Sequence, residues 1–398
     1  MMLSVKRLFW IILATLLTGQ AAAWELSGNI AAEAQYYPSK GLYSDQQDES
    51  FSLSLQPKLS HEWNDRDDAF VGEIFLRADA GDDNRQHADI REFKWLHISG
   101  DDEWRIGIDT VFWGVTESQH LVDVISSIDR LEGVDGEDKL GQPMIHYTTI
   151  QDWGVFHVFV LPGFRASEFH SAEGRLRFPL LVDADEARYE SSDKESHIDL
   201  ALRYTKMLGD SELGLSLFKG TSREPQLIAG TNSKGQPVLI PYYAQINQFG
   251  LDLQSIVEDW LLKLELIYRD QDSGSYFATT AGFEYTFYGI MDSAVDLGTL
   301  MEYSYDDRSK ADAGVFNNDL FAGLRFAFND VQSSEVLAGF IVDTDNQSKT
   351  LRVEASRRLG DSWKLNGEVQ VFTDIDDGDP LKTYEKDDYL LVELARYF

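Results

Sequence analysis

Apolar and polar residues alternate along most of the chain with a period of two, which is typical of β-strands. In the segment 196–205, isoleucine, leucine and tyrosine on one face alternate with His197, Asp199 and Arg203 on the other. The same alternation is clear in three further segments, 262–269, 351–358 and 363–372. Charged residues are frequent on the polar faces, which favours strands whose inner side lines a water-filled lumen.

The pattern predicts an all-β chain of about 18 antiparallel strands, or of 16 if one hairpin too many has been counted. The expected strands cover residues 24–37, 51–63, 69–80, 89–99, 103–112, 142–151, 154–162, 195–207, 212–220, 242–256, 260–270, 275–288, 294–305, 317–328, 333–343, 348–358, 363–373 and 387–398. Their lengths suit the roughly 9–11 residues that a tilted strand needs to cross a bilayer.

The connections between the expected strands fall into two length classes. Connections after even-numbered strands are short, as at Gly100–Asp102, whereas most connections after odd-numbered strands are long, as at Trp113–Gly141 and Gly163–Lys194. Transmembrane barrels of bacterial outer membranes have short periplasmic turns and long outer loops. We therefore predict that residues 24–398 form one transmembrane antiparallel β-barrel with both ends in the periplasm.

The first residues, Met1–Ala23, predict a cleaved signal peptide. Lys6 and Arg7 precede the apolar stretch Leu8–Leu17, and three alanines follow at Ala21–Ala23. This order of a charged, an apolar and a small-residue region is typical of secretory signals, and the apolar stretch is short for a spanning helix. Export of a barrel-forming chain predicts an integral protein of the outer membrane of a Gram-negative bacterium.

The last residues, Leu390–Phe398, alternate apolar residues and stop on an aromatic side chain. They resemble the C-terminal signal that the barrel-assembly machinery reads, with departures at Arg396 and Tyr397. We expect that machinery to be a partner through Phe398, along with outer-membrane lipid and lipopolysaccharide.

Composition excludes several classes of function. The formal charge of −33 argues against nucleic acid as a partner, and the absence of cysteine excludes thiolate catalysis and cysteine-bound metals. The histidines do not fall at metal-ligand spacing, and Asp374–Asp379 lacks the ligand spacing of a calcium loop. No motif marks a nucleophile with its base. We therefore expect no enzyme activity, no catalytic residue, no metal and no cofactor, with a barrel-embedded hydrolase as a remote alternative.

The long connection 113–141 breaks the strand pattern. Ser118 is a plausible helix N-cap and Gly133 a plausible stop. Apolar residues between them recur at helical spacing, at Leu121, Val124, Ile125 and Ile128. We predict a helix within this loop after the fifth strand, and we expect the loop to fold toward the lumen as a constriction or plug. The alternative is a lid or partner-binding loop on the outside.

The segment Arg105–Gly114, with Val122–Ile125 and Asp129, resembles a family of Gram-negative outer-membrane barrels related to the alginate-export porins. Many members of that family have no assigned function. The sequence departs from the family pattern at Asp109, where glutamine is usual, and at Ser126–Ser127, where Asn-Pro is usual. The resemblance implies a barrel in the outer membrane and does not imply a polysaccharide substrate.

The function predicted from the sequence is a porin-like channel for small or polymeric hydrophilic solutes of unknown identity. An acidic loop opposite basic wall residues would create a transverse field that sets selectivity, although the same charges could simply fasten the loop through ion pairs. The alternative is a plugged, non-conducting barrel that acts as an adhesin, an assembly factor or a partner scaffold. The expected pathway residues are Arg105, Asp109, Glu117, Asp123, Arg203, Lys263, Glu265, Arg269 and Arg352.

Overall fold

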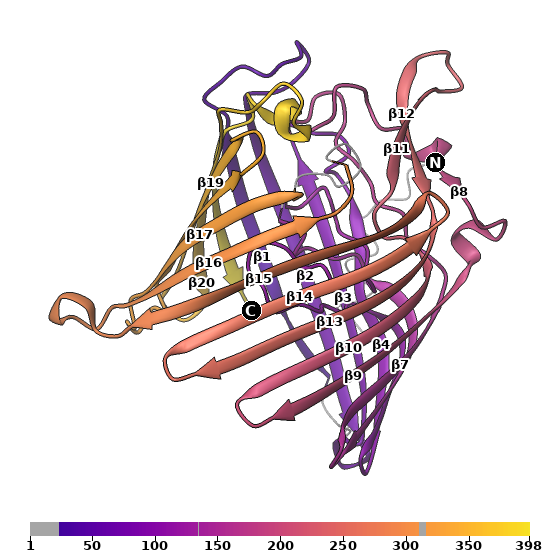
Figure 1. Cartoon of the computed structure of the whole chain (residues 1–398), viewed down its shortest axis with the longest axis vertical. Coiled ribbons are helices and arrows are strands. Elements are labelled where there is room, and N and C mark those ends of the chain that lie inside the picture. Colours follow the sequence, from indigo (N-terminus) through magenta and orange to yellow (C-terminus); the bar gives the residue numbers. More distant parts are fainter. Residues whose placement is uncertain (1–23, 134, 310–315) are drawn as a thin grey trace.

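The computed structural model describes residues 24–133, 135–309 and 316–398, and the predicted signal peptide lies outside them. Eighteen antiparallel strands form one closed barrel, which confirms the predicted fold and strand count (Figure 1). The strands are β1 (Glu25–Tyr36), β2 (Glu49–Trp63), β3 (Asp68–Asp79), β4 (Ala88–Ser99), β5 (Asp102–Asp109), β6 (Gln142–Gln151), β7 (Gly154–Pro162), β9 (Ile198–Leu208), β10 (Ser211–Thr221), β13 (Gln245–Val257), β14 (Trp260–Gln271), β15 (Gly274–Phe287), β16 (Asp296–Asp306), β17 (Asn318–Ala327), β18 (Glu335–Asp343), β19 (Lys349–Leu359), β20 (Trp363–Thr373) and β21 (Tyr389–Tyr397).

Each strand pairs with the next barrel strand along the chain, and the first strand closes the sheet against the last. In that closing pair, Asn29 lies opposite Tyr397 and Tyr36 lies opposite Leu390. Closure leaves no strand of the barrel with unpaired backbone groups along an edge, as a β-structure in lipid requires.

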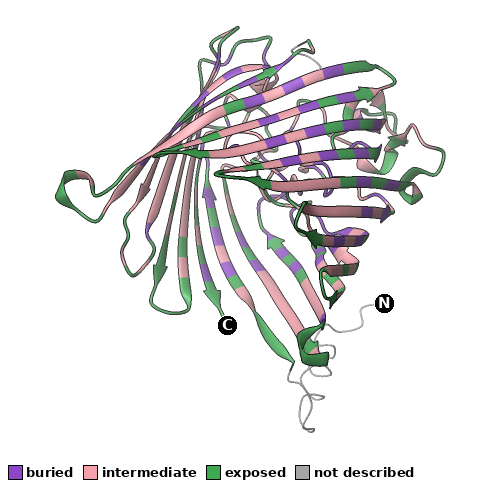
Figure 2. Cartoon of the chain, turned by 60° about the horizontal axis from the view of Figure 1, so that its bottom comes forward, coloured by how far each residue is buried: buried purple, intermediate pink, exposed green. Residues whose placement is uncertain are grey.

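Side chains alternate between the two faces of the wall, as the bands of burial in Figure 2 show. On β14, Leu262 and Tyr268 face outward and are exposed, whereas Glu265 and Ile267 face inward and are buried. The outer face of the barrel is thus apolar and the inner face is largely polar, the arrangement expected of a barrel whose outside contacts lipid.

Long connections gather at one end of the barrel and carry a second, small sheet. Its strands are β8 (Arg188–Tyr189), β11 (Gln226–Thr231) and β12 (Pro237–Tyr243), with β11 and β12 forming a hairpin that projects from this end (Figure 1). The sequence pattern did not predict this sheet. Among the described residues, helical structure is limited to short 3-10 segments, and none of these helices is long and apolar enough to cross a membrane.

At Gly107 on β5, the backbone of the neighbouring strand β4 approaches too closely for a side chain. The φ of Gly107 is +138°, and a Cβ there would lie 2.1 Å from the carbonyl oxygen of Phe93 on β4. We expect Gly107→Ala to lower the free energy of unfolding by about 1–3 kcal/mol, measured by urea titration of the refolded protein in detergent micelles. The control is Gly367→Ala on β20, where the nearest atom to a Cβ would be 3.8 Å away. Equal stability of the two variants would contradict the close approach.

Candidate functional site: the segment that crosses the lumen

The described residues of the connection from β5 to β6, 110–133 and 135–141, lie against the inner wall of the barrel. The predicted helix in this loop is wrong, since these residues form isolated turns and no helix. Several backbone N–H groups between Val115 and Val122 donate to carboxylates of the wall instead of within a helix. A chain whose polar backbone groups are satisfied by fixed carboxylates has no need of helical hydrogen bonds.

Glu265 on β14 is the main acceptor for this loop and is fully buried. Its Oε1 accepts hydrogen bonds from the N–H groups of Val115 at 2.7 Å and Thr116 at 3.1 Å, and from the Thr116 hydroxyl at 2.8 Å. Its Oε2 accepts from the N–H of Val122 at 3.2 Å. Glu265, a predicted pathway residue, thus fastens the start of the loop to the wall.

Glu302 on β16, two strands further around the wall from Glu265, also accepts hydrogen bonds from the loop. Its two carboxylate oxygens accept hydrogen bonds from the N–H groups of Glu117 and Ser118, each at 2.8 Å. Sequence reasoning missed Glu302, although alternation along its strand places it on the inner face. Two of its three donors are backbone N–H groups, which leave no signal in the sequence, and the third is the Ser118 hydroxyl at 2.6 Å.

An apolar cluster packs the middle of the loop onto the wall. Val122, Val124 and Ile125 are each at most 2% exposed. The wall contributes inward-facing apolar residues to the same cluster, Met144, Phe159, Leu161, Ala201, Phe218, Ile246, Ile267, Tyr276 and Ala278. These apolar side chains interrupt the polar inner face, and they pack directly against the apolar residues of the loop.

Two of the predicted basic residues do contact the loop. Lys263 on β14 lies 3.9 Å from Glu117, which forms a closer ion pair of 2.8 Å with Arg325 on β17. Arg352 on β19 reaches Asp135 at 2.7 Å. These contacts place the loop along the part of the wall between β14 and β19.

The remaining predicted pathway residues are neutralised elsewhere. Asp123 pairs within the loop with Lys139 at 2.8 Å, so it does not face a basic wall. Arg203 holds Asp252 through two bonds of 2.8 Å, and its guanidinium lies 5.0 Å above the Trp113 ring.

Arg269, Arg105 and Asp109 also have partners outside the loop. Arg269 donates to Gln248 at 2.7 Å. Arg105 pairs with a neighbouring wall carboxylate at 2.6 Å, and Asp109 with Lys94 on β4 at 2.6 Å. The structure thus brings Glu117, Lys263 and Glu265 together around the start of the loop, whereas the other predicted residues are distributed along the loop and the wall.

The far half of the loop meets a row of arginines that the sequence did not single out. Arg77 on β3 binds Glu132 at 2.6 Å, and Arg91 on β4 binds Asp129 at 2.6 Å. Arg85, in the connection 80–87, donates to the Leu131 carbonyl at 2.9 Å. These residues face the loop from the side of the barrel opposite to Glu265, so the loop is held at both ends.

Two aspartates of the loop have shifted pKa values of opposite sign. Burial raises the pKa of Asp123 above its usual value, and the charge of Lys139 opposes this only in part. Burial acts in the same direction on Asp129, but its hydrogen bond from His87 and the charge of Arg91 bring its pKa down to about 2. Asp129 is therefore ionised at neutral pH, and its charge remains available to the groups around it.

Comparison with protein-family models and with curated proteins finds no match. Among solved structures, a loop-deletion mutant of OmpT, an outer membrane protein of Vibrio cholerae, is similar over 95% of this chain and all of that one, at 10% identity and a TM-score of 0.47. A triple mutant of the Rh. blastica porin is similar over 94% of this chain and all of that one, at 13% identity and a TM-score of 0.46. The likeness to alginate-export porins finds no support here and stays a prediction.

Proposed function

We propose that this protein is an outer-membrane channel for hydrophilic solutes, whose passage is narrowed by residues 110–141. The observation that carries the proposal is a closed 18-stranded barrel with an apolar outside, a largely polar inside and one segment fastened across the lumen. Barrels of about this strand number are wide enough for an aqueous pore. A connection that crosses such a lumen limits the size of what passes.

Selectivity in this proposal follows from the charges that remain without a close partner. The wall arginines and lysines near the loop are engaged by carboxylates, as in the Arg325–Glu117 and Arg352–Asp135 pairs. Glu137 on the loop, in contrast, has a side chain that is 67% exposed, and it lies 3.9 Å from His120, which is charged only when protonated. In a chain with a formal charge of −33, we expect the open part of the lumen to prefer cations.

The test is conductance of the refolded protein in planar bilayers, with the reversal potential measured in a salt gradient. We expect stable open steps, a cation-selective reversal potential, and a larger step when Ser118–Glu132 is replaced by a short Gly-Ser linker. The control variant shortens the β11–β12 hairpin by removing residues 230–238, which form no hydrogen bond or ion pair with the described residues of the loop, and it should keep the wild-type step.

Each other outcome is informative. A silent wild-type protein that conducts after the replacement would identify the segment as a plug and overturn an open channel. Silence of both proteins, with correct folding shown by heat-dependent migration on gels, would overturn the channel altogether and favour a scaffold or adhesin.

A further inference from the structure

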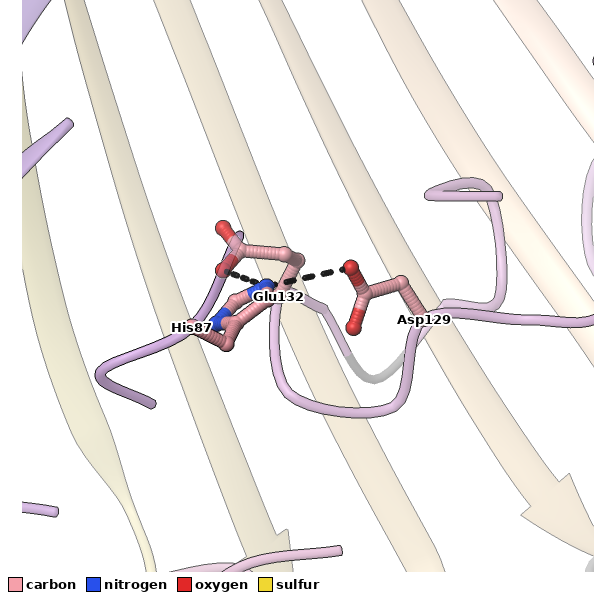
Figure 3. Close-up of side chains that lie close together, drawn as sticks. All are labelled: His87, Asp129 and Glu132. Carbon is pink, nitrogen blue, oxygen red and sulfur yellow. Dashed lines mark hydrogen bonds and ion pairs between the residues drawn. The ribbon is translucent and has the colours of Figure 1, made fainter. Parts of the chain in front are cut away.

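His87, Asp129 and Glu132 converge inside the barrel from two different connections (Figure 3). His87 is the last residue before β4, and the two acids belong to the segment 110–141. The Nε2 atom of His87 lies 3.3 Å from Asp129 Oδ2 and 3.5 Å from Glu132 Oε1. All three potential ligand atoms lie within 4.8 Å of one another.

The hydrogen bond on the far side of the imidazole fixes which nitrogen faces the two acids. Nδ1 of His87 lies 3.1 Å from the carbonyl oxygen of Arg85. A carbonyl only accepts hydrogen bonds, so Nδ1 carries a proton. The lone pair of a neutral imidazole then sits on Nε2 and points at two carboxylates. That arrangement is repulsive unless a cation or a second proton lies between them. Fixing a histidine through a carbonyl on its other nitrogen is common among metal ligands.

Glu132 offers an oxygen that has no hydrogen-bond donor. Its side chain is 5% exposed, and its Oε2 is bound by Arg77 at 2.6 Å. Its Oε1 is buried and has no hydrogen-bond partner, yet it points toward His87. A buried carboxylate oxygen without a donor is costly, and a bound cation would remove that cost.

Asp129 is held in place in the same way as Glu132. Arg91 donates to its Oδ2 at 2.6 Å, and the N–H of Leu131 donates to its Oδ1 at 3.3 Å. Charged and backbone donors around ligating carboxylates orient them and limit their motion. The three potential ligands are therefore all fixed by groups outside the cluster.

We propose that His87, Asp129 and Glu132 bind a divalent first-row transition-metal ion, for which Zn²⁺ is the probe. One imidazole nitrogen and two carboxylate oxygens suit Zn²⁺, whereas Ca²⁺ and Mg²⁺ take oxygen ligands. Metal–ligand bonds of about 2.0–2.2 Å place the ligand atoms of a tetrahedral site roughly 3.3–3.6 Å apart. The two distances from His87 Nε2 match that spacing, and water would complete the coordination.

A proton is the natural competitor for the same position. Metal binding requires a deprotonated Nε2, so affinity for Zn²⁺ should rise with pH. Bound metal would fasten the segment 110–141 to the connection that precedes β4.

One of the three residues also borders a cleft among the long connections. Glu132 lines this cleft together with residues of three other connections, among them Gln47, Arg85 and Arg175.

The experiment is isothermal titration of Zn²⁺ into the refolded full-length barrel in detergent, after treatment with a chelator. We expect one ion per barrel for the wild type, no matching uptake of Ca²⁺, and at least about tenfold weaker binding of Zn²⁺ by His87→Ala and by Glu132→Gln. The matched controls, His61→Ala on β2 and Glu137→Gln at an exposed position of the same loop, should bind like the wild type. Visible absorption of bound Co²⁺ would report the coordination directly.

Several results would overturn the site. These are no binding by the wild type, wild-type affinity in His87→Ala and in Glu132→Gln, or a loss of affinity in the controls as large as in those two variants. Folding of each variant is checked by heat-dependent migration on gels. Glu132→Gln preserves the size of the side chain, so it decides the question if His87→Ala fails to fold.

Discussion

Replacing Glu265 by alanine is expected to release the start of the lumen segment from the wall. The carboxylate accepts from three backbone N–H groups and one hydroxyl of residues 115–122, all in a buried environment. Three buried N–H groups left without an acceptor cost about 1–3 kcal/mol each, less whatever water recovers on entering. The expected sum, roughly 3–6 kcal/mol, is enough to populate a detached loop.

Two measurements report detachment in Glu265→Ala. Limited trypsin digestion should cut after Arg130 or Lys139 in the variant at concentrations that leave the wild type intact. Single-channel recordings should show frequent transitions between two conductance levels. Glu265→Gln, which keeps one acceptor oxygen, should give an intermediate result.

Glu284→Ala on β15 is the matched control for Glu265. It also removes an inward-facing wall carboxylate, but the ion pairs of Glu284 with Lys263 and Arg325 are long, at 3.9 and 3.8 Å. It should digest and conduct like the wild type. If Glu265→Ala also behaves like the wild type, the carboxylate does not hold the loop, and packing alone must do so.

The barrel could be predicted from the sequence because two solvents impose a simple rule on every strand. A residue faces either lipid or the lumen, so apolar and polar positions must alternate, as Leu200 and Leu202 do with Asp199 and Arg203. The alternation is repeated in every strand, and connection lengths supply an independent check. Local sequence therefore carried enough information to count the strands.

The lumen segment could not be predicted in the same way. Leu121, Val124 and Ile125 have helical spacing, but the structure uses them in an irregular chain whose backbone bonds to Glu265 and Glu302. Periodicity indicates which residues make apolar contacts, but it does not indicate which acceptors the backbone N–H groups bind. The conformation depends on carboxylates that lie more than 140 positions further along the chain.

The candidate metal site escaped sequence analysis for a related reason. His87 and Asp129 are separated by 42 positions and belong to different connections. Metal motifs are recognisable when the ligands share one helix or one loop, where spacing fixes geometry. Here the barrel wall sets the geometry, through the adjacency of β3 and β4 to the far half of the segment.

Replacing Ile125 by aspartate is expected to expel the middle of the lumen segment from the wall. Ile125 is completely buried in the apolar cluster with Val122 and Val124. An apolar side chain of this size contributes about 1.5–3 kcal/mol by burial, and an unpaired carboxylate in its place costs several kcal/mol more. Ion pairs give less net stability than their number suggests, since each charge must first lose its water. We therefore expect apolar contact to dominate retention of the segment.

The measurements are conductance and trypsin sensitivity, now compared at low and high salt. Ile125→Asp should give the larger conductance step of the linker replacement and be cut readily by trypsin, whereas high salt alone should leave the wild-type segment in place, with no change to the larger step and no gain in trypsin sensitivity. Ile125→Val is the matched control, because it removes one methylene group and should cost only about 1 kcal/mol. The opposite pattern, in which high salt moves the wild type to the larger conductance step and Ile125→Asp retains the loop, would show that ion pairs such as Arg77–Glu132 hold the segment and that the apolar cluster is secondary.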